Sequence, residues 1–303
     1  MTGLGGVAVA TRAFRGMGLP GACDENLGVL RRIRLGFTAG EIAESVSCAL
    51  LLGAECVEDV DRLREDPAVE KMLGYRPPSA RAVRDWLERC HDAEAVERAR
   101  GQALELELKS SVPEPTEGLR GLQAVVGVSA RAAAARQPGG SPQMATVDLD
   151  ATVVESGKRS ALIAYTGERG YQPVIAVWAE ARAVLATEFR DGNVPAGKDP
   201  ACCARLAFAE IPASVRELAF RGDSACDNRE LLDWLDDVAR DGGPRGIIHY
   251  AVSARMEPDL AAAARRVADE AWTTFGRDSD GTLKQCAELD YVPGLRSENK
   301  HAR

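Results

Sequence analysis

The stretch Ala145-Thr-Val-Asp-Leu-Asp150-Ala-Thr152 gives the strongest indication of the fold. It predicts a short apolar strand over Ala145–Asp150 that ends in acidic residues. Two further strands are predicted over Pro173–Ala179 and Ala183–Arg190, and the tight turn between them makes the pair a hairpin. Three consecutive strands therefore open the second half of the chain.

Helices and strands alternate after this hairpin. The order β, β, β, α, β, α, β, α predicts an α/β fold with a mixed sheet and flanking helices. The later segments are a helix over Asp199–Glu210, a strand over Glu217–Arg221, a helix over Asn228–Arg240, a strand over Gly246–Val252 and a helix over Pro258–Glu270.

The residues before the first strand follow a different pattern. Residues 27–110 read as a helical domain: Thr38 and Glu41 form a capping-box start, and Ser79 can cap a later helix. Residues 111–143 are punctuated by Pro and Gly and are predicted to be a linker. We expect residues 1–26 to be a loose N-terminus, and residues 144–303 to form the α/β domain.

Composition limits the class of protein. The 303 residues are 45% hydrophobic, which is too apolar for a disordered chain, and carry a net charge of -8. No run of 18 apolar residues predicts a membrane span, and no secretory signal is recognisable, so a cytoplasmic protein is expected. The eight cysteines form no C-x-x-C pair and the chain has three histidines, which argues against a zinc finger.

Acidic residues follow two of the predicted strands. Asp148 and Asp150 are two apart and therefore point to one face of a strand. Asp223 follows a later strand that could lie beside the first. Carboxylates that converge at strand ends suit Mg²⁺, which prefers oxygen ligands; the alternative is that they cap the following turns.

Two mechanisms fit this pattern of acids. In one, two metal ions support phosphodiester transfer. In the other, Asp148 is a phosphorylated nucleophile and Asp150 its acid/base, as in haloacid-dehalogenase-like phosphatases, whose metal motif resembles Gly222–Asp227. The hairpin that follows the first strand favours the first mechanism, because it matches the opening meander of an RNase H-like fold.

One predicted helix carries basic residues on its polar face. Arg81, Arg84 and Arg89 lie opposite the apolar residues of the helix after Ser79, and such a helix could enter a DNA major groove. The alternative is a solvated helix face. Residues 1–140 contain 18 basic and 20 acidic residues, so no net positive field supports DNA binding there.

Several motifs in order resemble the DDE-type transposases of bacterial insertion sequences, within the group numbered thirteen-eighty. They are Asp148-Leu-Asp-Ala-Thr152, Gly167-Glu-Arg-Gly-Tyr-Gln-Pro173, Glu188-Phe-Arg-Asp-Gly-Asn193 and Phe220-Arg-Gly-Asp-Ser224. The resemblance implies an RNase H-like core dependent on Mg²⁺ or Mn²⁺, a helical DNA-binding region, and cleavage and strand transfer of DNA. The implied partners are the terminal inverted repeats, target DNA and a second copy of the chain in a nucleoid-associated complex.

The resemblance also assigns residues. It makes Asp150 and Asp223 the first two acids of the catalytic triad and metal site, with Asp148 as a supporting ligand. Arg221 would contact phosphate or form a salt bridge. Three more residues match family positions near the active face, or serve as turn and hairpin residues: Tyr171, Arg190 and Asn193.

The third acid of the triad has no match. Glu270 and Glu288 are the late acids in plausible positions, and neither fits the family motif. We therefore expect a C-terminally truncated transposase with little or no strand-transfer activity, or a non-catalytic DNA-binding relic.

Overall fold

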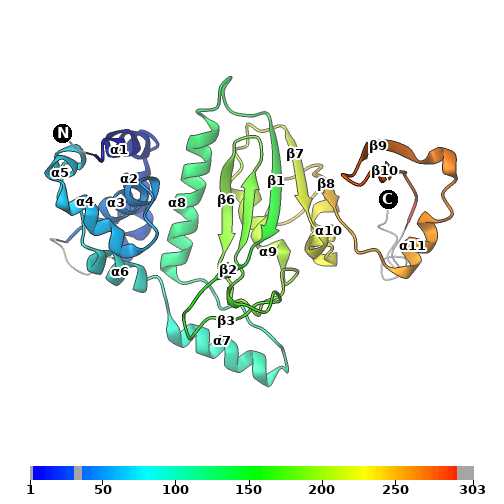
Figure 1. Cartoon of the computed structure of the whole chain (residues 1–303), viewed down its shortest axis with the longest axis horizontal. Coiled ribbons are helices and arrows are strands. Elements are labelled where there is room, and N and C mark those ends of the chain that lie inside the picture. Colours follow the sequence, from blue (N-terminus) through cyan, green and yellow to red (C-terminus); the bar gives the residue numbers. More distant parts are fainter. Residues whose placement is uncertain (1–2, 31–35, 292–303) are drawn as a thin grey trace. The chain divides into compact units, whose positions relative to one another are not determined.

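The computed structural model describes residues 3–30 and 36–291. The chain forms two compact units, Met1–Val252 and Ser253–Arg303. The first unit contains the main sheet and most of the helices (Figure 1).

A five-stranded mixed sheet is the centre of the first unit, in the order β6-β5-β1-β7-β8. β1 is antiparallel to β5 and parallel to β7, β5 and β6 form the predicted hairpin, and β8 continues the parallel side. This arrangement confirms the predicted mixed sheet. The strands are β1 Met144–Ala151, β5 Val174–Trp178, β6 Ala183–Glu188, β7 Glu217–Gly222 and β8 His249–Val252.

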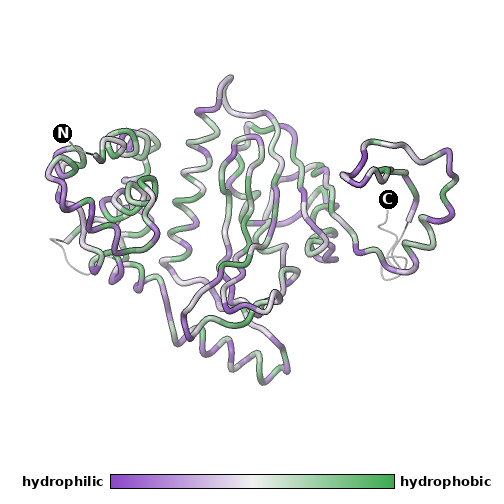
Figure 2. Tube along the Cα trace, in the orientation of Figure 1, coloured by the Kyte–Doolittle hydropathy of each residue, from purple (hydrophilic) through white to green (hydrophobic). Residues whose placement is uncertain are grey.

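The two faces of this sheet differ in burial. On β1, Val147 and Leu149 are buried, whereas Asp148 is half-buried and Asp150 exposed. The buried face belongs to a core that includes residues of α9 (Pro200–Ala209) and α10 (Arg229–Asp236). In Figure 2 the strands carry mostly apolar residues interrupted by hydrophilic positions. The acidic residues of β1 therefore project from the more open face, as the alternation predicts.

A small three-stranded sheet, formed by residues between β1 and β5 in the sequence, was not predicted. Its order is β2-β4-β3, and its strands are β2 Val154–Glu155, β3 Leu162–Ile163 and β4 Arg169–Tyr171. Strands of two or three residues are too short to show a periodicity of two in the sequence. This sheet directly follows the acidic end of β1.

The N-terminal helices enclose a second core, made of buried residues from α1 to α6. The capping box of Thr38 and Glu41 is present, and Ser79 accepts a hydrogen bond from the Ala82 amide, as predicted. The helices are α1 Gly6–Gly16, α2 Leu19–Leu27, α3 Ala39–Leu51, α4 Asp61–Glu65, α5 Pro67–Leu73, α6 Ala80–Glu88 and α7 Ala93–Glu105, with 3-10 turns at Gly28–Leu30 and Val57–Val60.

The expected loose N-terminus is helical instead. Residues 6–27 form α1 and α2, and Val7, Cys23 and Leu27 are buried in the second core. The segment is rich in Gly and small residues, which weakens any helical periodicity. Burial against α3 stabilises these helices where intrinsic propensity does not.

The expected linker contains the longest helix of the described residues, α8 (Glu117–Ala134). Figure 1 shows α8 beside β6, and α8 contacts both α2 and β6. The Thr116 hydroxyl caps α8 by accepting from the Leu119 amide. Its glycines suggested a connector, but Gly118 and Gly121 are buried where α8 meets the N-terminal helices.

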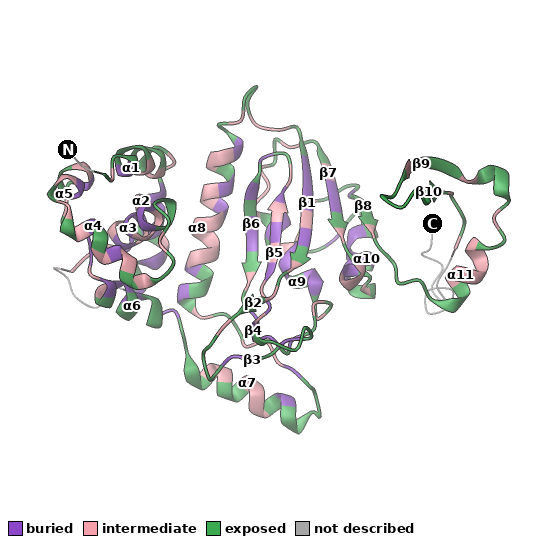
Figure 3. Cartoon of the chain, in the orientation of Figure 1, coloured by how far each residue is buried: buried purple, intermediate pink, exposed green. Residues whose placement is uncertain are grey.

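The second unit has little buried surface. It contains α11 (Pro258–Ala264), a 3-10 turn (Asp269–Ala271), and the hairpin of β9 (Thr273–Arg277) and β10 (Leu283–Cys286). Figure 3 shows both strands as largely exposed. Among the described residues of the whole chain, no helix combines the length and apolar character that a membrane crossing requires.

Candidate active site

Asp150 and Asp223 lie on neighbouring parallel strands. In the register of β1 and β7, Leu149 is paired with Gly222. The next residues are Asp150 on β1 and Asp223 directly after β7, and both lie at the same end of the sheet. Because adjacent strands are about 4.8 Å apart, this register places the two residues at neighbouring positions at one end of the sheet.

Each of these carboxylates is held by a local backbone amide. Asp150 Oδ1 accepts from the Ala151 amide at 2.8 Å. Asp223 Oδ1 accepts from the Ala225 amide at 2.9 Å and so caps the 3-10 turn Ser224–Cys226. Within the described residues, the Oδ2 atom of each side chain accepts no hydrogen bond. Two exposed carboxylates with one free oxygen each are a suitable set of oxygen ligands for a divalent cation.

A buried thiol lies next to this pair and was not predicted as part of the site. Burial raises the pKa of Cys226 to about 12, and the negative charges of Asp223 and Asp150 contribute in the same direction. A Cβ atom on Gly222 would lie 2.5 Å from Cys226 Sγ. Glycine at position 222 therefore lets the chain turn tightly after β7 and carry Asp223 beside β1.

Asp148 and Arg221 form an ion pair beside the two acids. They are paired residues in the register of β1 and β7. Arg221 Nε donates to Asp148 Oδ1 at 2.6 Å, and Nη2 donates to Oδ2 at 2.7 Å. The hydrogen bond with Asp148 is the main cause of the raised pKa of Arg221. Of the two roles predicted for Arg221, the structure shows the salt bridge, and Asp148 is its partner.

The arginines of α6 that were predicted to bind DNA differ in exposure and in the groups they contact. Arg81 is 89% exposed in its side chain and lies 4.0 Å from Asp85. Arg84 is paired with Glu58. Arg89 donates to the Leu30 carbonyl at 2.7 Å.

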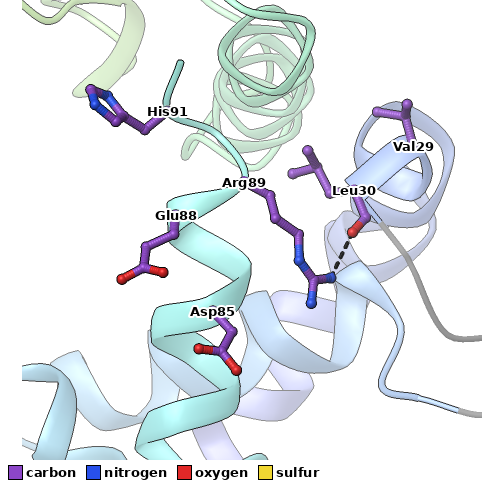
Figure 4. Close-up of a pocket in the computed structure, with 6 residues that line it drawn as sticks. All are labelled: Val29, Leu30, Asp85, Glu88, Arg89 and His91. Carbon is purple, nitrogen blue, oxygen red and sulfur yellow. Dashed lines mark hydrogen bonds between the residues drawn. The ribbon is translucent and has the colours of Figure 1, made fainter. Parts of the chain in front are cut away.

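Acidic side chains surround the same helix face. Figure 4 shows Asp85 and Glu88 beside Arg89 in a cavity of about 590 Å³, which is also lined by Val29, Leu30 and His91. The polar face of α6 is therefore of mixed charge, and Arg81 is its most open cation.

The other residues named by the resemblance have structural partners. Arg190 is fully buried and donates to Glu188 and to the Lys198 carbonyl at 2.6 Å. Tyr171 packs against Phe189 with ring centroids 4.7 Å apart. These two side chains fix the segment after β6.

No third acid joins the pair in the described part of the chain. Residues 3–30 and 36–291 contain no group of three or more His, Cys, Asp or Glu residues that could hold a metal ion. Glu270 and Glu288 both belong to the second unit and are exposed.

Comparison with known proteins identifies the family. A family model described as "Transposase DDE domain group 1" matches residues 1–294. No curated protein matches the sequence.

A piggyBac transposase, solved by cryo-EM in a synaptic complex with hairpin DNA, is similar at 12% identity and a TM-score of 0.38. The alignment covers 95% of this chain and 63% of that chain, so the present chain spans less than two thirds of that transposase. A similarity this remote carries no argument about fold or function. The family match extends over nearly the whole chain, and on that basis the protein belongs to the DDE-domain transposases of group 1.

Proposed function

We propose that this protein is the transposase of a bacterial insertion sequence, of the group numbered thirteen-eighty, which binds the element's ends and cleaves and joins DNA. The observation that carries the proposal is the register of β1 and β7, which sets Asp150 beside Asp223. The strand order also supports an RNase H-like core, since an antiparallel meander of β1, β5 and β6 is followed by the parallel strands β7 and β8.

Asp150 and Asp223 are the residues that would hold Mg²⁺ or Mn²⁺, each through its free Oδ2 atom. Bound metal would supply activation of a water or 3′-hydroxyl and stabilisation of the leaving oxygen. The protein's own contribution is orientation: the Ala151 and Ala225 amides fix the two carboxylates before metal arrives.

Asp148 has a positioning role in this proposal rather than that of a ligand. Both of its oxygens accept from Arg221, which neutralises the charge and fixes the register of β1 and β7 close to the metal ligands. The same engagement disfavours the phosphatase alternative, because Asp148 would have to leave Arg221 before its carboxylate could approach a phosphate.

We also propose that the described residues alone support little strand transfer. Metal-dependent phosphodiester transfer in this family implies three acids, and the described residues bring no third one into a group with Asp150 and Asp223. DNA binding does not depend on this ligand. Arg81 on α6 is the most open of the arginines proposed to contact DNA, and a second copy of the chain would allow two element ends to be held together.

The proposal is tested with the complete chain and DNA that flanks its gene, as labelled duplexes in Mg²⁺ or Mn²⁺. We expect end binding by the wild type, and weak nicking or joining that disappears in Asp150→Asn and Asp223→Asn. Asp233→Asn is the control, because Asp233 is an exposed acid on α10 whose side chain pairs with Arg229. If the wild type did not bind the element ends specifically, the proposed transposase function would be contradicted. Robust strand transfer would contradict only the proposed low activity.

A further inference from the structure

A cavity of about 240 Å³ lies near the small sheet, outside the carboxylate site. One side is formed by α7 and the residues that follow it, and the other by β3 and the segment after β6. Its volume is below the roughly 300 Å³ of pockets that hold drug-sized ligands, so it suits a single small unit. The lining residues are Arg100, Ala103, Leu104, Leu108, Lys109, Ser110, Ser111, Leu162, Asp191 and Asn193.

Leucine side chains form an apolar wall of this cavity. Arg100, Ala103 and Leu104 share one face of α7, because they are three and four residues apart. Leu104 is 77% exposed and Leu108 is 47% exposed. These two leucines therefore offer apolar contact to a ligand in the cavity.

Polar groups line the opposite side. Arg100 Nη2 donates to Asp191 Oδ2 at 3.0 Å, while its Nε atom is buried and has no hydrogen-bond partner in the described residues. Asn193 donates to the Lys109 carbonyl at 3.1 Å and so links the two sides. Arg100 Nη1 also donates to Glu97 at 2.9 Å, so two carboxylates match the charge of Arg100. Lys109 is then the lining cation that forms no ion pair within the described residues, and it favours an anionic ligand.

The cavity is close to the acidic end of β1. Asp191 is bridged to Tyr171, which pairs with Val154 in the small sheet. Tyr171 is three residues before Val174, the partner of Ala151. Three residues of extended chain span about 10 Å, so the cavity lies within a few nucleotides of Asp150 along a bound strand.

We propose that this cavity binds one nucleotide of the DNA substrate, with the base against Leu104 and Leu108 and the phosphate toward Lys109. The inference rests on the proposed function for its choice of DNA. A nucleobase combines a flat apolar face with polar edges, and this cavity offers an apolar wall with Ser110, Ser111 and Asn193 at its margin. A leucine wall alone would suit a protein partner equally, but the ammonium of Lys109 and the polar margin favour a nucleotide.

The test uses the complete chain without metal and the probes dAMP, dGMP, dCMP and dTMP, with binding followed by saturation-transfer NMR. Leu108→Glu places a negative charge in the wall and is expected to weaken binding at least tenfold. Leu106→Glu is the matched control: Leu106 is 69% exposed but does not line the cavity. It should change affinity by less than twofold.

A second variant, Ser111→Trp, fills the cavity and should abolish the signal in protein whose thermal melting is unchanged. No saturation transfer from any mononucleotide, or equal losses in Leu108→Glu and Leu106→Glu, would overturn the inference; equal losses would point to a general apolar surface for a protein partner. Asp150→Asn should bind the mononucleotides normally. Failure of the metal-site proposal would therefore leave this result intact, and failure of nucleotide binding would leave the metal site untouched.

Discussion

The contact between α8 and α2 gives a prediction whose sign depends on the fold. Gly121 on α8 is buried against the C-terminal end of α2. A Cβ atom at position 121 would lie 2.3 Å from the Asn26 carbonyl oxygen and 2.8 Å from Leu27 Cδ2. The nearest obstacle is backbone, which cannot rotate away, so Gly121→Ala forces the two helices apart.

The magnitude follows from two opposing effects. Alanine is favoured over glycine within a helix by about 1 kcal/mol, whereas overpacking a buried contact costs about 1–3 kcal/mol and more when backbone must move. We expect a net loss of about 2 kcal/mol, or roughly 4–8 °C in Tm for a unit of this size. Gly101→Ala on α7 is the matched control, because no atom lies within 4 Å of its Cβ position.

Thermal and urea unfolding of both variants measure the effect. Gly101→Ala should stabilise by up to about 1 kcal/mol, opposite in sign to Gly121→Ala. If Gly121→Ala also stabilised the protein, α8 would not be packed against α2, and residues 111–143 would behave as the linker that the sequence suggested.

Two further predictions concern buried side chains. The Glu44 side chain is 3% exposed and accepts hydrogen bonds from Arg15 at 2.7 and 2.8 Å and from Tyr75 at 3.0 Å. Glu44→Ala should lower the free energy of unfolding, measured by urea denaturation, by about 3 kcal/mol. A loss below about 1 kcal/mol would show that these hydrogen bonds do not form in solution. The raised pKa of Cys226, about 12 through burial and its acidic neighbours, keeps the thiol protonated in the folded protein, so iodoacetamide at pH 8 should label exposed Cys286 first by mass spectrometry. Equal labelling of Cys226 and Cys286 in the folded protein would contradict the buried position of Cys226. Because the pKa of Cys226 in the folded protein exceeds the unfolded value of about 8.5, the contribution of this thiol to stability is complete below about pH 8.5 and is lost as the pH rises toward about 12.

Much of the main sheet could be predicted because its signals are local and strong. The hairpin of β5 and β6 is marked by two apolar runs and a three-residue turn. Acids at the ends of two predicted strands suggested that β1 and β7 could be neighbours, and these strands pair in the sheet. Caps at Thr38 and Ser79 also matched, since cap chemistry depends on adjacent residues.

The remaining elements depend on contacts distant in sequence. Helix α8 was hidden by Gly118 and Gly121, which serve close packing and not flexibility. Helix α5 starts at Pro67, since proline suits the first turn of a helix although it interrupts a helix that precedes it. At the site, no local pattern could show that Asp148 pairs with Arg221 or that Cys226 lies beside both acids, because each contact is created by the register or turn after β7.

The central claim is that Asp150 and Asp223 together bind a divalent metal. Mn²⁺ titration followed by electron paramagnetic resonance, which detects the free ion, tests it on the complete chain without any DNA. We predict a bound ion in the wild type and in Asp233→Asn, with affinity at least tenfold lower in both Asp150→Asn and Asp223→Asn. Binding of Mn²⁺ that is unchanged by either of these two substitutions would contradict the account.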